Sequence, residues 1–441
     1  MSNRDKYGKT YIDYIDEKIM PFIRYDGYDC RYPTISPVYF DNNFYEEIRV
    51  ISEKLFKIFV KTVKVFQQCP DDFMDKMEIP QKLKPYLNIP NVLNLPTWLS
   101  RFDYVFDKDY NLKMVEINAD TPCAIVESYY GNGIASEFFN ADNPNDGEYV
   151  KLQYFLKSIA DKTSNLKVNL NTYDFHKSQF LFSCFHDYIE DYGTTMFLLN
   201  ALKQVNDDYK VNLSFESFYD LKVSFDGHVE MSNGEYANTL YRLHPMELLI
   251  EEQANDGDDL GILFMEGYKN GKFKMFNPPE ALLMQSKGFQ ALVWALANID
   301  DSPFDDDEIA IVKQYMLPSY FEDDYKLLDK RLSDKWIVKP IWGREGNGIK
   351  VVDQFSTILV KEVPNPEDIV QRDSLSKLYQ YFVEQPTFIA ETDYAENDPG
   401  YLTLSCFMLG DKSSAVYSRF SYEQVSGTEA FWIPSLVKKK N

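Results

Sequence analysis

The chain has 441 residues, of which 44% are hydrophobic and 16% aromatic, so it can bury a large core. This composition excludes a disordered polymer and a small disulfide-stapled domain. The formal net charge of −23 disfavours binding to nucleic acid or to an anionic membrane, because phosphate groups would be repelled. We therefore expect a globular protein with neither of these partners, whose acidity serves solubility or attracts a cationic ligand.

The five cysteines are far apart in the sequence and show neither CxxC nor Cys/His spacing. They predict neither a disulfide framework nor a zinc site. No stretch approaches the roughly 18 apolar residues that a membrane-spanning helix needs. We expect a soluble, cytoplasmic protein.

The first predicted element is one long amphipathic helix, because apolar residues recur at helical spacing from Phe44 to Val63. Prolines punctuate the next stretch, from Pro80 to Pro96, which indicates an irregular connection. Two strand-like segments then flank a polar turn, which predicts a hairpin of Arg101–Asp107 and Leu112–Asn118.

Polar side chains of this hairpin are expected to converge. If Asp107 faces the first residue of the second strand, antiparallel counting places Asp103 opposite Glu116 and Arg101 opposite Asn118. Carboxylate and amide oxygens suit Mg²⁺, which commonly bridges protein carboxylates and nucleotide phosphates. The alternative is an ordinary hairpin with a solvated polar face.

Helices and strands are both predicted in the middle of the chain, so the fold class is mixed. The helices are Val150–Ile159 and Thr194–Val205, and the strands are Gln179–Phe185 and short pieces within Phe215–Glu230. Two acidic runs, Asp256–Asp259 and Asp300–Asp307, are interpreted as solvated loops.

A second constellation lies in the carboxyl-terminal half. Two apolar strands, Trp336–Pro340 and Ile349–Val352, flank a glycine-rich segment at 343–348 that contains Arg344. Glycines let backbone N–H groups approach phosphate oxygens, and Lys339 would offset phosphate charge. The segment is not a Walker A loop, since no Lys-Ser or Lys-Thr pair follows the glycines. A structural turn is the alternative.

Three further residues are functional candidates: Lys287, Arg419 and Cys123. Lys287 and Arg419 lie in apolar contexts, where a cation needs an anionic partner or must reach the surface along its apolar stem. Cys123 could be a nucleophile, but no histidine lies near it in the sequence, which favours packing.

Together, these segments resemble the ordered motifs of glutathionylspermidine synthase-like ATP-grasp ligases, from about Tyr39 to Val437. The resemblance implies an α+β ATP-grasp fold, with mixed antiparallel sheets, flanking helices and a glycine-loop lid over the phosphates. The matching segments are Arg101-Phe102-Asp103, Val115 to Pro122, Lys287, Lys339 to Gly346, and Arg419 ahead of Phe431-Trp432-Ile433-Pro434.

The resemblance also implies a role for individual residues, with ATP and Mg²⁺ as cofactors. Metal binding falls on Asp103, Glu116 and Asn118; ATP binding on Lys287, Lys339, Gly343, Arg344, Gly346 and Gly348, with adenine at Glu384 and Gln385. Arg101 and Arg419 would lie near the transferred phosphate, Thr121 and Cys123 near the acid substrate, and Glu190 and Asp191 near a polyamine.

The activity that this resemblance implies is an ATP-dependent, ADP-forming carboxylate–amine ligase that acts through an acyl phosphate on a small-molecule acid and an amine. The alternatives are a catalytically silent ATP-binding regulatory protein and a peptide ligase that joins amino acids. Residues 242–247 keep only part of the family's Trp-rich pattern, and no amidase-like region precedes the matching segments, so only synthetase chemistry is expected.

One interlocked catalytic unit with three regions is expected. A helical region spans residues 1–100, a metal- and substrate-binding subdomain spans 101–275, and the ATP-grasp lid and carboxyl-terminal subdomain span 276–441. The oligomeric state is left open.

Overall fold

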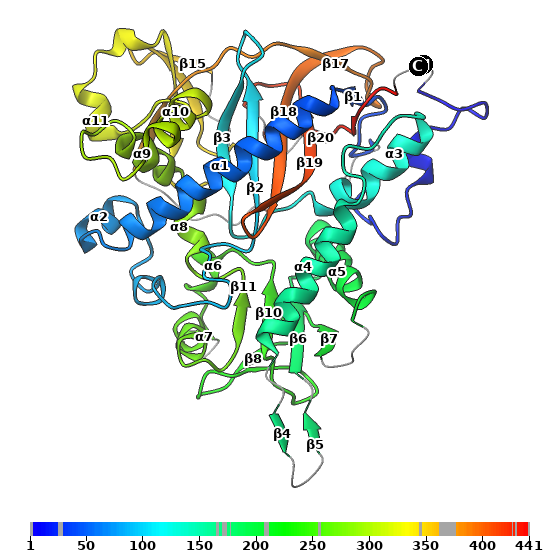
Figure 1. The fold of residues 1–441 in the computed structure, drawn as a ribbon, viewed down its shortest axis with the longest axis vertical. Helices are drawn as coiled ribbons and strands as arrows, with labels where there is room; N and C mark the ends of the chain where they lie inside the picture. The colour runs from blue at the N-terminus through cyan, green and yellow to red at the C-terminus, as the bar shows by residue number, and fades with distance from the viewer. Residues whose placement is uncertain are drawn as a thin grey trace.

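The computed structural model has mixed α+β architecture, as expected, and is built around three larger sheets of six, five and four strands (Figure 1). It describes residues 3–24, 30–164, 167–169, 174–176, 178–206, 211–254, 257–343, 346–360, 376–425, 427 and 430–439.

The predicted amino-terminal helix is confirmed as α1 (Asn42–Phe66). Its apolar stripe, including Ile48, Leu55 and Phe59, is buried in the main core. Figure 1 shows α1 crossing one face of the six-stranded sheet. The proline-punctuated stretch that follows holds only the short turns α2 (Asp71–Lys76) and η2 (Lys84–Tyr86).

The six-stranded sheet lies at the centre of the molecule and is antiparallel. Its strand β2 is buried along its whole length, so its polar residues Ser100, Arg101 and Asp103 lie inside the protein, where charged groups need partners. The strands are β20 (Phe431–Trp432), β19 (Lys412–Ser421), β18 (Asp398–Leu409), β2 (Leu99–Phe106) and β3 (Leu112–Asn118), and β17 (Phe388–Ala390) adds to β18.

The predicted register of the β2–β3 hairpin is confirmed where the polar residues lie: Arg101 pairs with Asn118 and Asp103 with Glu116. The turn itself was misjudged by one residue, because Phe106, not Asp107, faces the first residue of β3. A bulge beyond Asp103 restores the expected register by inserting one extra residue, Val115, into β3.

The five-stranded sheet is also antiparallel and contains the second predicted strand pair, in which Trp336 faces Val352. Helices α9 (Lys287–Leu296) and α11 (Glu322–Leu327) pack against it. Its order is β12 (Ser319–Phe321), β16 (Lys377–Tyr381), β13 (Lys335–Pro340), β14 (Lys350–Asp353) and β15 (Ile358–Val360).

The four-stranded sheet departs from the expectation of antiparallel sheets, because all its pairs are parallel. Crossover helices make this possible: α5 (Ile189–Lys203) joins β6 to β7. Helix α5 begins five residues before the predicted Thr194, with acidic residues in its first turn that favour a helix amino terminus. The strand order is β11 (Lys274–Phe276), β10 (Thr239–Arg242), β6 (Ser178–Ser183) and β7 (Val211–Phe215).

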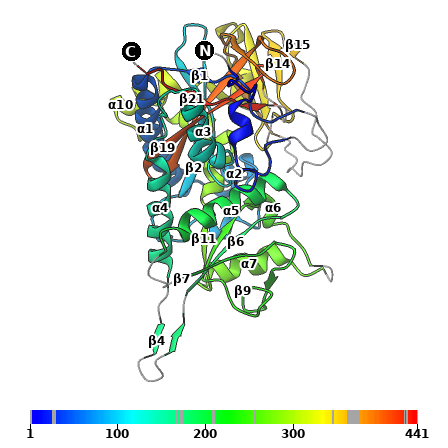
Figure 2. The same cartoon turned by 90° about the vertical axis from the view of Figure 1, so that its right-hand side faces the viewer.

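A small hairpin of β4 (Lys167–Asn169) and β5 (Asp174–His176) projects from the end of the molecule that carries this parallel sheet (Figures 1 and 2). Shorter elements complete the described chain. They are η1 (Tyr11–Tyr14), η3 (Glu127–Gly131), α3 (Asn132–Phe138), α4 (Glu148–Thr163), β8 (Lys222–Val223), β9 (Val229–Glu230), α6 (Met246–Leu249), α7 (Leu260–Lys269), α8 (Ala281–Gln285), α10 (Asp306–Tyr315) and η4 (Lys330–Leu332).

The amino-terminal segment at residues 30–40 lies against the last strands of the chain. Strand β1 (Val38–Tyr39) pairs in parallel with β21 (Ser435–Leu436). The Thr34 amide donates to the Trp432 carbonyl at 2.8 Å. Early and late parts of the sequence therefore share one sheet edge.

The acidic runs are not simply solvated loops, which corrects the sequence interpretation. Asp305 accepts a hydrogen bond from the Glu308 amide and caps α10, whose first turn holds the end of that run. Asp259 caps α7 and forms an ion pair with Lys82. Acidic side chains at helix amino termini accept hydrogen bonds from free backbone N–H groups. Their negative charge also interacts favourably with the positive end of the helix dipole. Asp256 lies outside the described residues.

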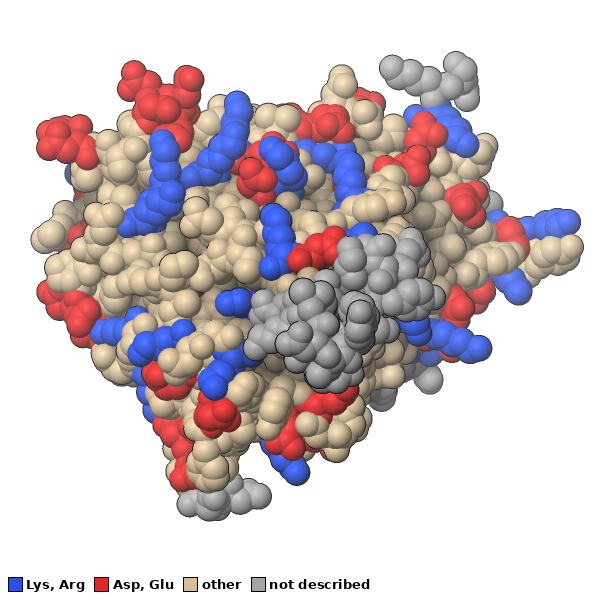
Figure 3. Space-filling view, turned by 60° about the horizontal axis from the view of Figure 1, so that its bottom comes forward, with Lys and Arg blue, Asp and Glu red and all other residues tan. Residues whose placement is uncertain are grey.

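The surface charges do not segregate on the face shown in Figure 3, where Lys and Arg side chains lie interspersed among Asp and Glu. The net charge of −23 is therefore not gathered into one acidic area on this face. Among the helices of the described residues, none has the length and apolarity that crossing a bilayer requires.

A fully buried ion pair joins the central sheet to the parallel sheet. Asp120, two residues beyond β3, accepts two hydrogen bonds from the guanidinium of Arg242 at the end of β10. Asp120 also accepts from the Met246 amide at 2.9 Å, and Arg242 donates to the His244 carbonyl at 2.6 Å. These bonds compensate both charges, which would otherwise be costly to bury.

Removing one partner should be strongly destabilising. We expect Arg242→Met to lower the free energy of unfolding by about 3–5 kcal/mol, because Asp120 would remain as an uncompensated buried charge. The matched control is Arg331→Met, which breaks an exposed pair with Asp329 and should leave the free energy of unfolding nearly unchanged. Equilibrium urea unfolding of both variants measures the difference, and equal losses would contradict it.

Glu280, before α8, gives a pH-dependent prediction. Burial raises its pKa from the ordinary 4.5 to about 8. Between these values the folded state keeps a proton that the unfolded state has lost, so stability falls as pH rises. We expect Glu280→Gln to be more stabilising at pH 8.5 than at pH 5 by roughly 2–4 kcal/mol. Urea unfolding at both pH values tests this, and a pH-independent difference would contradict it.

Candidate functional site

A buried ion pair on β2 forms the centre of the site. Arg101 Nε donates to Asp103 Oδ1 at 2.7 Å, and Arg101 Nη2 donates to Oδ2 at 2.8 Å. Although burial opposes it, the Arg101 guanidinium lowers the pKa of Asp103. The third guanidinium nitrogen, Nη1, donates to the Cys123 carbonyl at 2.8 Å. Arg101 therefore fixes both a carboxylate and the segment that follows β3.

A second arginine reaches the same carboxylate from β19. The charge of Arg419 also lowers the pKa of Asp103, which places the two side chains close together. The Nε atom of Arg419 is buried and makes no hydrogen bond to any described residue. Such a donor is suited to an anionic oxygen.

The oxygen ligands predicted for Mg²⁺ lie on adjacent strands. Glu116 and Asn118 share one face of β3, and Asp103 faces Glu116 from β2. Asn118 Nδ2 donates to Asp103 Oδ2 at 3.2 Å, which turns its amide oxygen to the opposite side. Among the described residues, no group of three or more His, Cys, Asp and Glu side chains could hold a metal.

The donor set nevertheless fits magnesium. It consists of two carboxylates and one amide oxygen, all hard ligands. Magnesium usually takes only one or two protein carboxylates and completes its shell with phosphate oxygens and water. Three residues on two strands would therefore hold the ion, and the remaining positions would be left to a nucleotide.

Two lysines from the carboxyl-terminal half reach this region. Lys339 Nζ, on β13, lies 3.5 Å from the carbonyl oxygen of Val115, the bulged residue of β3. Burial lowers the pKa of Lys339 to about 8, although the negative charge of Glu116 raises it in part. Lys287, the first residue of α9, donates to the Gly343 carbonyl. The sequence-predicted cations and oxygen ligands thus face one space.

The glycine-rich segment has the backbone that only glycine adopts easily. Gly343, Gly346 and Gly348 have φ values of 150°, 74° and 70°. Arg344, the cation predicted within this segment, lies outside the described residues.

The residues predicted to bind adenine follow β16 and have protein partners. Glu384 Oε1 lies 3.0 Å from Lys335 Nζ, and Gln385 Nε2 donates to the Gln424 carbonyl at 3.5 Å. Lys335 and Lys339 lie at opposite ends of β13, about 13 Å apart along an extended strand. This separation is of the size that a nucleotide spans between its base and its terminal phosphates.

The residues predicted to meet the acid substrate continue directly from β3. Thr121 is buried and Cys123 is half-buried. Cys123 Sγ lies 4.0 Å from the Thr121 carbonyl oxygen, and the Cys123 carbonyl is the one that Arg101 binds. This segment therefore borders the Arg101–Asp103 pair.

The acidic pair, Glu190 and Asp191, lies in the first turn of α5 and is brought to the same centre. Burial, and then the charge of Glu190, raises the pKa of Glu127 to about 8. Arg101 acts on Glu127 in the opposite direction. Glu190 and Arg101 thus both act on one buried carboxyl group, whereas Asp191 acts on Cys184 and Tyr241.

Glu127 was missed in the sequence, although a signal exists. It is a single carboxylate in the stretch from Ala124 to Gly131, which is otherwise uncharged. If the uncharged stretch is buried, its one carboxylate is buried with it. A buried carboxylate needs a compensating partner or has a function.

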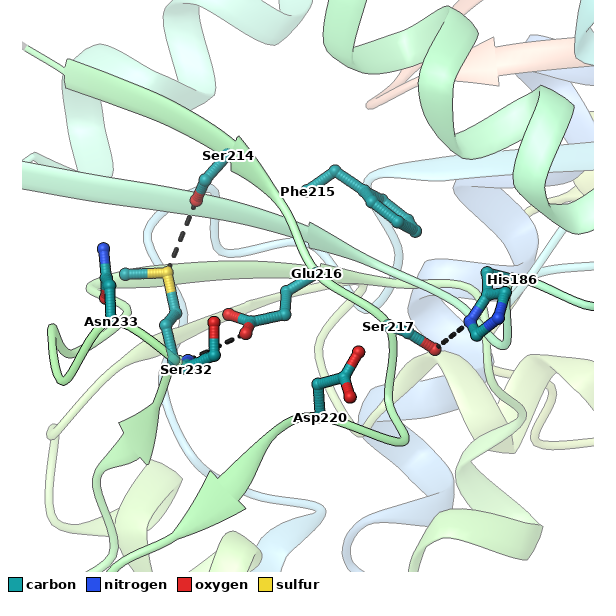
Figure 4. A pocket seen from close by; sticks show the side chains of 9 residues that line it. His186, Ser214, Phe215, Glu216, Ser217, Asp220, Ser232 and Asn233 are labelled. Atoms are coloured by element: carbon teal, nitrogen blue, oxygen red, sulfur yellow. Dashed lines mark hydrogen bonds between the residues drawn. The ribbon is translucent and has the colours of Figure 1, made fainter.

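A separate hollow of about 410 Å³ opens at the carboxyl ends of β6 and β7, beside the loop that leads into α5 (Figure 4). There His186 Nδ1 lies 2.9 Å from Ser217 Oγ, and Glu216 accepts from the Ser232 amide at 2.7 Å. None of the residues that line it belongs to β2, β3, α9 or β13, so this hollow is separate from the Arg101–Asp103 pair and from Lys287 and Lys339.

Comparisons with known proteins identify the family of the chain and support its fold. The family described as glutathionylspermidine synthase preATP-grasp matches residues 14–438. A Haemophilus influenzae (strain Rd) protein, provisionally named an acid–amine ligase, is 24% identical over 353 residues, 77% of this chain and 74% of that protein.

A solved structure supports the fold alone. The apo form of a glutathione synthetase-like effector (GSS30) from Globodera pallida superposes with a TM-score of 0.55 at 11% identity, covering 92% of this chain and 90% of the other. The family match spans nearly the whole sequence, and the chain therefore belongs to the glutathionylspermidine synthase preATP-grasp family.

Proposed function

We propose that the protein is an ATP-dependent, ADP-forming ligase that joins an acid to an amine through an acyl phosphate. The observation that carries the proposal is the approach of Lys339 to the bulge of β3, which brings a buried cation beside the carboxylate of Glu116. A metal-bound triphosphate needs this combination of oxygen ligands and cations. The names of the family and of the Haemophilus relative support the same reaction class.

In this proposal, ATP lies along β13. Its phosphates are bound by Lys287 and Lys339 under the glycine-rich segment, which serves as a lid, and its adenine lies near Glu384 and Gln385. Bound Mg²⁺ would neutralise phosphate charge and be held by Asp103, Glu116 and Asn118. The division into regions 1–100, 101–275 and 276–441 belongs to the same proposal.

The reaction has two steps. The substrate carboxylate attacks the γ-phosphorus of ATP, and ADP leaves; an amine nitrogen then attacks the acyl carbon, and phosphate leaves. Arg101 and Arg419 orient the anionic oxygens, since fixed cations stabilise charge without reorganisation. Thr121 and Cys123 border the acid, and the lid excludes water that would hydrolyse the intermediate.

The lysine on β13 gives the first test. We expect Lys339→Ala to reduce ADP formation at least about 100-fold while leaving the unfolding midpoint nearly unchanged, because the side chain would serve phosphate binding rather than packing. The control is Lys113→Ala, which removes a lysine of β3 that only donates to the Gln314 carbonyl. ADP release is measured for acids, including glutathione and amino acids, crossed with polyamines and amino acids, and product masses are confirmed.

Turnover of Lys339→Ala at the wild-type rate would contradict the role of this lysine. If the wild-type protein binds ATP tightly but releases no ADP with any pair, the silent regulatory alternative replaces the ligase. Peptide products alone would favour the ligase that joins amino acids.

The metal ligands give a second test. We expect Asp103→Asn to raise the Mg²⁺ concentration needed for half-maximal ATP binding by about 10–100-fold, because it removes a charge from the donor set and keeps its shape. Asp107→Asn, in the exposed hairpin turn, is the control and should leave it unchanged. Calorimetric titration of ATP at a series of Mg²⁺ concentrations checks this, and an unchanged requirement in Asp103→Asn would rule out the assignment.

A further inference from the structure

Glu127 is a fully buried carboxyl group that the two-step scheme leaves without a role. Its carboxylate oxygens have no hydrogen bond of good geometry to a described residue, and the Tyr32 hydroxyl lies near enough to lower its pKa. It is the first residue of η3, a π-helical turn set before α3. Burying a carboxyl group without a partner is costly, and π-helical turns occur often at functional sites.

The turn that carries Glu127 is held firmly against the central sheet. Asn145 Nδ2 donates to the Ser128 carbonyl at 3.0 Å. At the end of the turn, the backbone of Gly131 lies directly on the ring of Trp432, where a Cβ atom would come within 2.6 Å of it. These contacts therefore fix the backbone position from which the Glu127 side chain extends.

The groups that face Glu127 come from four different parts of the fold. After burial, the charge of Glu190 on α5 is the largest influence that raises its pKa, while Tyr32 of the amino-terminal segment and Arg101 of β2 lower it. Burial and then Glu127 raise the pKa of Tyr417 on β19. Two carboxyl groups, two hydroxyl groups and one guanidinium therefore surround one position.

The one cation in this set is already engaged. Arg101 donates through Nε and Nη2 to Asp103 and through Nη1 to the Cys123 carbonyl. Glu127 thus lies beside a cation whose donors are directed elsewhere. A positively charged ligand with N–H donors could compensate the charge of the Glu127 carboxylate and donate hydrogen bonds to it.

We propose that Glu127 binds the reacting ammonium group of the amine substrate and accepts the proton that this group must lose before it attacks. This inference rests on the proposed function and adds a proton acceptor to it. Glu190, exposed at the start of α5, and its neighbour Asp191 would bind a second positive charge farther out.

The proton-transfer step balances. One N–H bond of the ammonium breaks and an O–H bond forms on Glu127. The freed lone pair forms the C–N bond, and the C–O bond to phosphate breaks with its electron pair. The second N–H proton leaves with the phosphate. Burial and Glu190 raise the pKa of Glu127 to about 8, so without a ligand the group keeps its proton at neutral pH. A bound ammonium lowers that pKa, because an opposite charge favours the carboxylate, and Glu127 can then accept the proton.

Glu127→Gln tests the ammonium site, because it keeps the size of the side chain and removes its charge. Spermidine and putrescine are titrated calorimetrically in the presence of magnesium and a non-hydrolysable ATP analogue. We expect the variant to bind both at least about tenfold more weakly than the wild-type protein. The control is Glu280→Gln, the other buried carboxyl group with a pKa near 8, which should bind as the wild type does.

Equal binding by wild type and Glu127→Gln, or no binding of either amine by the wild type, would overturn the inference. Glu127→Asp keeps the charge and should retain binding. Loss of binding in both variants would show a packing role and would also overturn it.

Hydroxylamine separates this inference from the proposed function, because it is largely neutral at pH 7.5 and needs no proton acceptor. With ATP and an accepted acid, we expect Glu127→Gln to form the hydroxamate within about threefold of the wild-type rate and to form the polyamine amide at least about 100-fold more slowly. Equal losses in both reactions would count against Glu127 as the proton acceptor. If the wild type forms no hydroxamate and releases no ADP with any acid, the ligase proposal fails, while the calorimetric comparison still judges the ammonium site.

Discussion

The buried ion pair between Arg101 and Asp103 is the constraint on which the site depends. Removing both charges from water is costly, and the cost is offset only by good geometry and further hydrogen bonds. Both are present: two bonds link the pair, and Arg101 uses its remaining nitrogen on the Cys123 carbonyl. One guanidinium therefore orients a predicted metal ligand and also fixes the start of the segment that leads to Glu127.

The candidate site lies where three sheets meet, which explains why no single sheet contains it. Strand β3 belongs to the central sheet, its bulge receives Lys339 from the five-stranded sheet, and the residues after it are tied to the parallel sheet through Asp120 and Arg242. Ligand sites occur preferentially at such junctions. Substrates held by different sheets can then approach one another at a common edge.

Much of this arrangement could be predicted from the sequence, because side-chain alternation in a hairpin is a strong constraint. The pairing of Arg101 with Asn118 and of Asp103 with Glu116 is confirmed, yet the turn was misjudged by one residue and the bulge at Val115 went unnoticed. A bulge is a feature of the backbone and has no side-chain signature. The two errors cancelled, so the polar pairing was right although the path to it was not.

Other features could not be found in the sequence because they exist only in three dimensions. Glu127 stands out in the sequence only as the single charge between Ala124 and Gly131; its complete burial beside Glu190 and Arg101 depends on segments far apart in the chain. Asp305 reads as part of an acidic run, but it caps α10. The roles assigned to individual site residues stay predictions until ligands are bound.

The contact between residues 30–40 and the last strands has a consequence for biosynthesis. On the ribosome, this segment emerges hundreds of residues before its partners near Trp432 and Ser435 exist. Tyr32, which lies near Glu127, shares a hydrogen bond with Tyr417, so this contact also forms late in synthesis. The surroundings of Glu127 can therefore form only after the strands around Tyr417 and Trp432 have left the ribosome.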